Sequence, residues 1–402
     1  MTAAVTDRDA GAAPGGAAPA PARDIGVLLL ASLLFSASFQ LLTTIVPLRV
    51  VDLGGTGLEV GLITGVFAAS SLVVRPLIGW QLDRSRRLPL VVLGASIFAV
   101  SSFGYSLVAT VWALLVLRSL HGLGMATQTT ASQTLIVDLA PPRQRGSVLG
   151  LLGACPSIAM GVGPAAGAAL LAAAGYNPVF YLSCGLALLA IVASALVREP
   201  APAPRSPGRG RWRLLHPAMV RPGIALVALQ FGFGAAITFL PLLARERDLP
   251  NPGLFFTCYA VAVVISQTIG GRISDRASRM AVVIPGLAIA AAGLLCIATF
   301  PGWWLLVAGT VFGLGLGAAQ PALLALAGDL VPASERGAAM ASLGVFLELG
   351  IGGGATVTGA LSATIGLGPA FIICAGVALA GAVVTQLMRS GMGGQPPAPA
   401  RP

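Results

Sequence analysis

Four ionisable side chains lie inside long apolar segments, where an unpaired charge is costly. Arg118 and His121 are three residues apart, so on a helix they share nearly one face. Glu348 lies midway along a second apolar segment, and Arg75 lies near the end of a third. A low-dielectric medium disfavours a charged carboxyl group, and imidazole titrates near neutral pH. Glu348 or the pair of Arg118 and His121 is therefore the predicted proton-coupling site, and Arg118 can also hold an anion.

Each of these residues also has a structural interpretation. His121 can be a hydrogen-bonded side chain between helices, and Glu348 can be an uncharged packing residue or a ligand for a cationic substrate. Arg75 can extend along its helix toward the aqueous phase, or it can support a charged cluster by reaching Asp138. The sequence leaves these alternatives open.

The composition is that of an integral membrane protein. Of 402 residues, 56% are hydrophobic and only 9% are charged, whereas a soluble domain has about a quarter charged residues. The net charge of +10 comes from arginines scattered between apolar segments, which argues against a nucleic-acid surface. Five cysteines without CxxC spacing and two histidines predict no metal site, and no cofactor is expected. A phosphate-binding loop is absent from the sequence, so ATP is not the predicted energy source.

The apolar segments predict an all-α membrane protein with twelve transmembrane helices. A spanning helix needs about 20 mostly apolar residues, and its backbone must be hydrogen-bonded internally. Segments that meet this condition lie at 25–50, 58–82, 88–109, 112–137, 146–174, 178–197, 221–244, 253–275, 280–300, 303–330, 336–365 and 367–388. Residues 1–24 and 389–402 are predicted to be disordered cytosolic tails, and the Arg- and Pro-rich segment 198–220 a cytoplasmic linker between two six-helix bundles, 25–197 and 221–388.

Arginine placement predicts the orientation in the membrane. If both termini are cytoplasmic, eighteen arginines fall in the inside segments and three in the outside segments. Cytoplasmic loops are enriched in positive charge. Both termini are therefore expected in the cytoplasm.

The two predicted bundles are copies of one unit. At an offset of about 190 residues, the chain repeats the same charged positions, pairing Asp83 with Asp275, Arg87 with Arg279, Asp138 with Asp329 and Arg145 with Arg336. Parallel duplication of a six-helix unit is a transporter architecture in which the binding site lies between the halves. The repeat predicts two pseudo-symmetric bundles around a central site.

Three local motifs give these segments a family resemblance. The loop after the second span follows the pattern G-x-x-x-D-R-x-G-R-R at Gly79, Asp83, Arg84 and Arg87, with Arg86 and Leu88 as departures. The fourth span carries R-x-x-x-G-x-G from Arg118, and the fifth carries G-P-x-x-G at Gly163, Pro164 and Gly167. The chain resembles the major facilitator superfamily over residues 25–388. The fifth-span element is typical of its drug:proton antiporter branches, although Ala159 replaces a glycine expected upstream.

The resemblance implies roles for further residues. It implies a cytoplasmic gating latch made of the loop motif and its repeat, with the members Gly79, Asp83, Arg84, Arg87, Asp138 and Arg336, and Asp275, Arg279, Asp329 and Arg145. It also implies a cavity lined by the first, fourth, seventh and tenth spans, with the candidates Phe39, Gln40, Arg118, Gln230, Phe231 and Gln320. The first span lacks an acidic residue, which argues against a polycationic substrate.

The predicted function is secondary active transport, with proton-coupled efflux of a hydrophobic or amphipathic small molecule. The expected partners are the substrate, protons and the lipid bilayer, and the expected state is a monomer in a bacterial plasma membrane. Proton-coupled uptake of a metabolite or siderophore is an alternative that the fifth-span element disfavours. A membrane receptor or enzyme is more remote, because the sequence shows neither a nucleophile with a base nor a metal cluster.

Overall fold

The computed structural model describes residues 22–82, 84–141, 144–199, 215–247, 251–332 and 335–392. The predicted tails lie mostly outside these ranges, as does most of the predicted linker. At the two ends, helix continues into the predicted tails, since the first helix begins at Ala22 and the last ends at Met392. Asp24 stands in the first turn of the first helix, where a negative charge interacts favourably with the helix dipole.

The first half of the chain, called the N-half here, consists of seven helices. They are α1 (Ala22–Thr43), α2 (Ile45–Asp52), α3 (Gly57–Leu82), α4 (Leu88–Gly104), α5 (Val111–Leu139), α6 (Arg145–Ala174) and α7 (Tyr176–Ala195). The break between α1 and α2 has a local cause. Pro47 has no N–H, and its ring clashes with the carbonyl four residues back, at Thr43, where α1 ends.

The second half, called the C-half, begins with one 3-10 turn, η1 (Pro217–Met219). The helices that follow are α8 (Val220–Glu246), α9 (Gly253–Arg276), α10 (Met280–Thr299), α11 (Trp304–Asp329), α12 (Arg336–Ile365) and α13 (Leu367–Met392). The described residues contain helix and connecting turns but no strand, which confirms the all-α class.

Within the described residues, ten stretches of helix are long and apolar enough to cross a membrane, with α1 and α2 counted as one. The two predicted spans outside this set are α4, which has 17 residues, and α5, which carries many hydroxyl and amide side chains. The count of twelve and the orientation stay predictions. We call the end that holds Arg84, Arg87, Arg279 and Arg336 the arginine-rich end, and the other the opposite end.

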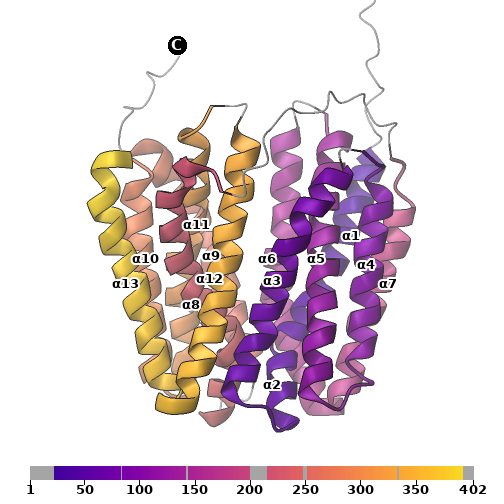
Figure 1. Cartoon of the computed structure of the whole chain (residues 1–402), viewed down its shortest axis with the longest axis horizontal. Helices are drawn as coiled ribbons and strands as arrows, with labels where there is room; N and C mark the ends of the chain where they lie inside the picture. Colours follow the sequence, from indigo (N-terminus) through magenta and orange to yellow (C-terminus); the bar gives the residue numbers. More distant parts are fainter. Residues whose placement is uncertain are drawn as a thin grey trace, which may run out of the picture.

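The two halves lie side by side, with the N-half on the right of Figure 1 and the C-half on the left. The most extensive contacts between them are those of α3 with α12 and of α6 with α9. On α3, Gly57, Gly61 and Gly65 face α12 at intervals of four residues; a Cβ atom at Gly61 would lie 2.5 Å from the carbonyl oxygen of Ala355. Small residues at this spacing allow close helix approach. We call this contact the glycine seam, and it belongs to the opposite end.

The second junction is closed at the same end. Thr257 of α9 donates a hydrogen bond of 2.6 Å to the carbonyl oxygen of Gly161 on α6, and Asn251 donates one of 3.0 Å to that of Ala165. The G-P-x-x-G element lies here, with Gly163 and Gly167 against α1: Cβ atoms there would lie 2.7 Å from the Cβ of Gln40 and 2.5 Å from the Leu41 carbonyl oxygen. Both junctions therefore seal the opposite end.

Candidate functional site

Glu348 and Arg75 form an ion pair across the boundary between the halves. Nη2 of Arg75 on α3 lies 3.1 Å from Oε1 of Glu348 on α12, and the hydroxyl of Ser71 donates to the same oxygen over 3.1 Å. The Glu348 side chain is 10% exposed and that of Arg75 is 38% exposed. The pair lies next to the glycine seam, on the side toward the arginine-rich end. Sequence reasoning selected both residues but did not pair them; the suggested contact of Arg75, Asp138, is instead paired with Arg87.

The buried position makes this pair sensitive to the charge of Glu348. Removing one partner of a buried ion pair typically costs about 3–5 kcal/mol, because the remaining charge is left without compensation. A proton on Glu348 likewise leaves the Arg75 guanidinium without its counter-ion, but at a smaller cost, because the Arg75 side chain is 38% exposed to solvent. Protonation of Glu348 would therefore weaken a contact that joins the two halves.

Arg118 and His121 form a second buried polar cluster, within the N-half. Nη1 of Arg118 lies 3.1 Å from Nδ1 of His121, and the Tyr105 hydroxyl lies 3.0 Å from the same nitrogen. Arginine can only donate, so this nitrogen is an acceptor, the ring is neutral and its proton is on Nε2. The guanidinium carbon lies 4.4 Å from the centre of the Phe67 ring and 5.9 Å from that of Phe39. Among the described residues, Arg118 has no acidic partner and Nε2 of His121 no hydrogen bond.

A cavity of about 710 Å³ lies at the arginine-rich end, between the halves. Its walls come from the portions of α1, α5, α6 and α12 nearest that end. The described lining residues are Ser32, Ser36, Gln128, Thr129, Thr130, Ser132, Gln133, Thr134, Val137, Leu149, Leu152, Gly153, Pro156, Gly337 and Met340. A volume of this size accommodates a drug-sized molecule.

Several of the predicted lining residues lie at contacts between helices. Gln40 is buried and accepts a 2.8 Å hydrogen bond from Thr43, and Phe39 stacks on Phe67. Gln230 is buried, and its Cβ would lie 2.7 Å from a Cβ at Gly350. None of the six candidates, which also include Arg118, Phe231 and Gln320, is a described lining residue of this cavity. A polar stretch at 127–134, TQTTASQT, was the signal for the α5 wall that sequence reasoning missed.

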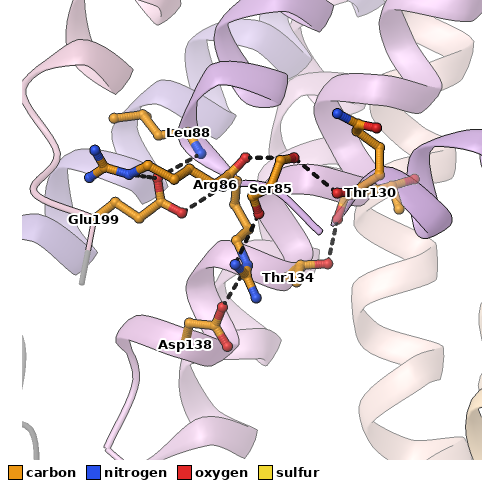
Figure 2. Close-up of polar contacts among 9 residues, drawn as sticks. Ser85, Arg86, Leu88, Thr130, Thr134, Asp138 and Glu199 are labelled. Atoms are coloured by element: carbon orange, nitrogen blue, oxygen red, sulfur yellow. Dashed lines mark hydrogen bonds and ion pairs between the residues drawn. The ribbon is translucent and has the colours of Figure 1, made fainter. Parts of the chain in front are cut away.

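Part of the predicted latch forms within the N-half. Nε of Arg87 lies 3.0 Å from Oδ2 of Asp138 at the end of α5. Glu199, which sequence reasoning missed, accepts hydrogen bonds from the backbone N–H groups of Arg87 and Leu88, at 2.6 and 3.2 Å, and lies 3.3 Å from Nε of Arg86 (Figure 2). A carboxylate at a helix N-terminus accepts hydrogen bonds from free N–H groups and interacts favourably with the positive end of the helix dipole. Glu199 therefore caps α4. Asp83 lies outside the described residues.

The repeated part of the latch forms within the C-half. Arg279 contacts both Asp275 and Asp329, with 2.9 Å between its Nε and Oδ2 of Asp329. These carboxylates, Asp329 foremost, raise the pKa of Arg279. Of the other members, Arg84 lies over the Trp80 ring, and Gly79 has open space where a Cβ would be.

The expected latch between the halves is not closed in this structure. Arg145 and Arg336 are both exposed, and neither makes an ion pair with any described residue. The reason is geometric: the arginine-rich ends of α6 and α12 flank the cavity. The latch between the halves stays a prediction, and a conformation in which this end is closed could form it by pairing Asp138 with Arg336 and Asp329 with Arg145.

A further ion pair joins the halves at the opposite end. Nη1 of Arg245 on α8 lies 2.8 Å from Oδ1 of Asp52 on α2, and the Tyr176 hydroxyl donates to Oδ2 of Asp52 over 2.5 Å. The Arg49 guanidinium lies over the Tyr176 ring at 4.9 Å. Sequence reasoning counted these arginines only as outside charges. We call the contact of Asp52 with Arg245 the outer pair.

Comparisons with known proteins agree with this architecture. The family model described as Major Facilitator Superfamily matches residues 28–255 and 223–401. The quinolone resistance protein NorA of Staphylococcus aureus is 24% identical over 240 residues, which span 57% of this chain and 61% of the relative. The alignment thus covers less than two thirds of that relative's length.

Two solved structures share the fold. One is a bacterial homologue of the human lysosomal transporter Spinster in an inward-facing and occupied conformation, with a TM-score of 0.79, 18% identity, and coverage of 95% of this chain and 100% of the other. The other is a mutant of the nucleoside transporter NupG, with a TM-score of 0.78, 13% identity, and coverage of 91% and 99%. At these identities the likeness extends to the fold alone.

Proposed function

The chain belongs to the Major Facilitator Superfamily, and we propose that it is a proton-coupled exporter of small amphipathic molecules. It is a multi-pass membrane transporter and not an enzyme, as the sequence predicted. We place it in a bacterial plasma membrane as a monomer, with the arginine-rich end in the cytoplasm.

Two observations support export. The relative NorA is named for quinolone resistance, and the G-P-x-x-G element of α6 resembles that of drug:proton antiporters. In the proposed cycle, a substrate enters the cavity from the cytoplasm while the glycine seam and the outer pair keep the opposite end closed. Closure of the arginine-rich end would then bring Asp138 to Arg336 and Asp329 to Arg145.

The observation that carries proton coupling is the ion pair of Arg75 with Glu348, because its carboxylate is buried and the pair crosses the boundary between the halves. Movement of the halves that separates α3 from α12 at this level would change the surroundings of Glu348. Its proton affinity would then differ between the two conformations. By linkage, a ligand that binds two states unequally shifts the equilibrium between them, and here the ligand is the proton. Arg118 and His121 lie within one half, so the same motion leaves their mutual contact unchanged.

The test uses the full chain in liposomes that enclose a pH-sensitive dye, with norfloxacin and uridine as probes under an imposed pH gradient. We expect probe flux against the proton movement in the wild-type protein. In Glu348→Gln, exchange of the probe should continue but lose its dependence on the gradient. Glu246→Gln is the matched control, because Glu246 is exposed and makes no ion pair with any described residue.

Three outcomes would contradict parts of this proposal. Wild-type flux that ignores the gradient would exclude proton coupling. Flux in the same direction as the protons would favour the uptake alternative. Normal gradient dependence in Glu348→Gln would assign the coupling to another group, with Arg118 and His121 as the next candidates.

A further inference from the structure

We infer that the cavity at the arginine-rich end binds uncharged molecules that carry hydrogen-bonding groups along one edge and an apolar surface along the other. This inference rests on the proposed transport function and names the substrate class of that site. It follows from the chemistry of the walls, from two hydroxyl groups without partners, and from the positions of the nearest membrane-embedded charges.

The walls of the cavity differ in polarity. The α1 and α5 walls present hydroxyl and amide groups, including those of Ser36, Gln128 and Gln133. The facing wall is apolar, with side chains such as Leu152 of α6 and Met340 of α12. Of the lining residues that the structure describes, none is charged. A ligand that matches these walls has one polar and one apolar edge.

Two hydroxyl groups in the polar wall are buried without a hydrogen-bond partner among the described residues. They are Oγ of Ser32, whose residue is 6% exposed, and Oγ1 of Thr130. Their neighbour Thr134 differs, because its hydroxyl donates over 3.0 Å to the backbone of its own helix. A buried polar group without a partner is costly, and a ligand that supplies the missing hydrogen bond removes that cost. Both residues line the cavity, so rotation of either hydroxyl toward it would let a ligand supply the missing hydrogen bond.

The membrane-embedded charged side chains nearest the cavity are either paired with another side chain or distant from the cavity. Glu348 is paired with Arg75. Arg118 donates to His121, and it precedes the lining residue Gln128 by ten residues, about 15 Å along a helix. A cationic ligand would thus find no carboxylate among the described lining residues, and an anionic ligand would find no guanidinium among them, since Arg145 and Arg336 flank the cavity without lining it. Burying a charge without compensation costs several kcal/mol, so the site favours neutral molecules.

The experiment measures, by mass spectrometry, which compounds the chain removes from an efflux-deficient bacterial host. The panel holds uncharged, cationic and anionic compounds of matched size, and cells with and without the protein are compared. We expect the exported set to be uncharged compounds with several hydrogen-bonding groups. Ser32→Ala should raise the KM for these compounds about 3- to 10-fold. The control is Thr310→Val, because that exposed residue of α11 bonds to its own helix and lies outside the cavity.

A second variant tests the role of charge directly. Gln133→Glu keeps the shape of the side chain and adds one negative charge to the cavity wall. We expect this variant to export cations from the panel that the wild-type protein ignores, with at least a tenfold gain in rate. Unchanged charge selection in an active Gln133→Glu protein would overturn the inference.

These outcomes distinguish failure of the inference from failure of the proposed transport function. Export of cations or anions by the wild-type protein, at rates equal to those of neutral compounds, would overturn the inference and leave the transport function standing. If the protein changes the accumulation of no compound in the panel, both the inference and the proposed export fail. Equal KM values for Ser32→Ala and Thr310→Val would remove Ser32 from the binding surface and overturn the argument from unpartnered hydroxyls.

Discussion

Loss of the outer pair should shift the protein toward a conformation that is open at the opposite end. The pair joins Asp52 of the N-half to Arg245 of the C-half, with side chains 33% and 63% exposed. Exposed ion pairs contribute about 0.2–1 kcal/mol, because solvent screens them. Asp52→Asn should therefore change the ratio of open to closed molecules about 1.4- to 5-fold. The hydrogen bond from Tyr176 can persist to an asparagine, so the effect belongs to the charge.

Spin labels at Leu107 and Trp303 report this shift. Both residues are well exposed at the opposite end, one in each half, at 71% and 60%. Labelling requires a background without the five native cysteines, all of which are free. In double electron–electron resonance, Asp52→Asn should increase the ratio of long-distance to short-distance molecules about 1.4- to 5-fold. High salt should produce a similar shift in the wild-type protein, because it screens exposed charges.

Glu246→Gln controls for the loss of a negative charge at the same end, since Glu246 makes no ion pair with any described residue. The reasoning is refuted if Asp52→Asn and Glu246→Gln give the same distance distribution. It is also refuted if Asp52→Asn favours the short distance.

Three further variants test the other contacts that hold the structure. Replacing Arg75 and Glu348 together by methionine should restore the unfolding temperature that either single variant loses, because an apolar pair avoids the desolvation cost of two charges. Proton coupling should stay absent in the double variant. Thermal unfolding measures the first result, and liposome flux measures the second. Gly61→Leu should destabilise the closed glycine seam by about 1–3 kcal/mol, whereas Gly79→Ala, with open space around it, should be neutral in the same unfolding assay. Glu199→Ala should cost about 1 kcal/mol through loss of the α4 cap, seen as faster amide exchange at the start of α4.

Local regularities of the sequence predicted most of the helices. Bilayer thickness sets a minimum length for an apolar helix, so the segments were visible without any tertiary information. The predicted span at 112–137, for example, is α5 at Val111–Leu139. Duplication predicted charged clusters at equivalent places, and the contacts of Arg87 with Asp138 and of Arg279 with Asp329 are such a pair.

Contacts between the halves could not be predicted in the same way. The pair of Arg75 with Glu348 depends on how α3 and α12 align along their length, and no local pattern specifies that alignment. The outer pair likewise joins residues that are 193 positions apart. The cap by Glu199 lies within the N-half, but it too joins residues more than 100 positions apart. Family motifs selected Arg118, which lies in a buried cluster with His121, but they did not select the polar wall of α5.

The two ion pairs that cross the boundary differ in what they can control. Moving a two-state equilibrium from 1:99 to 99:1 requires about 5.5 kcal/mol of differential binding. The outer pair, exposed and worth at most about 1 kcal/mol, cannot supply it. Loss of one partner of a fully buried pair is worth about 3–5 kcal/mol. The Arg75 side chain is 38% exposed, so protonation of Glu348 supplies less than this and only part of the total. Substrate binding in the cavity must provide the remaining free energy. Transport would therefore need both the proton and the substrate. Under the proposed mechanism, Asp52 adjusts the resting equilibrium, and Glu348 is the group through which the proton acts.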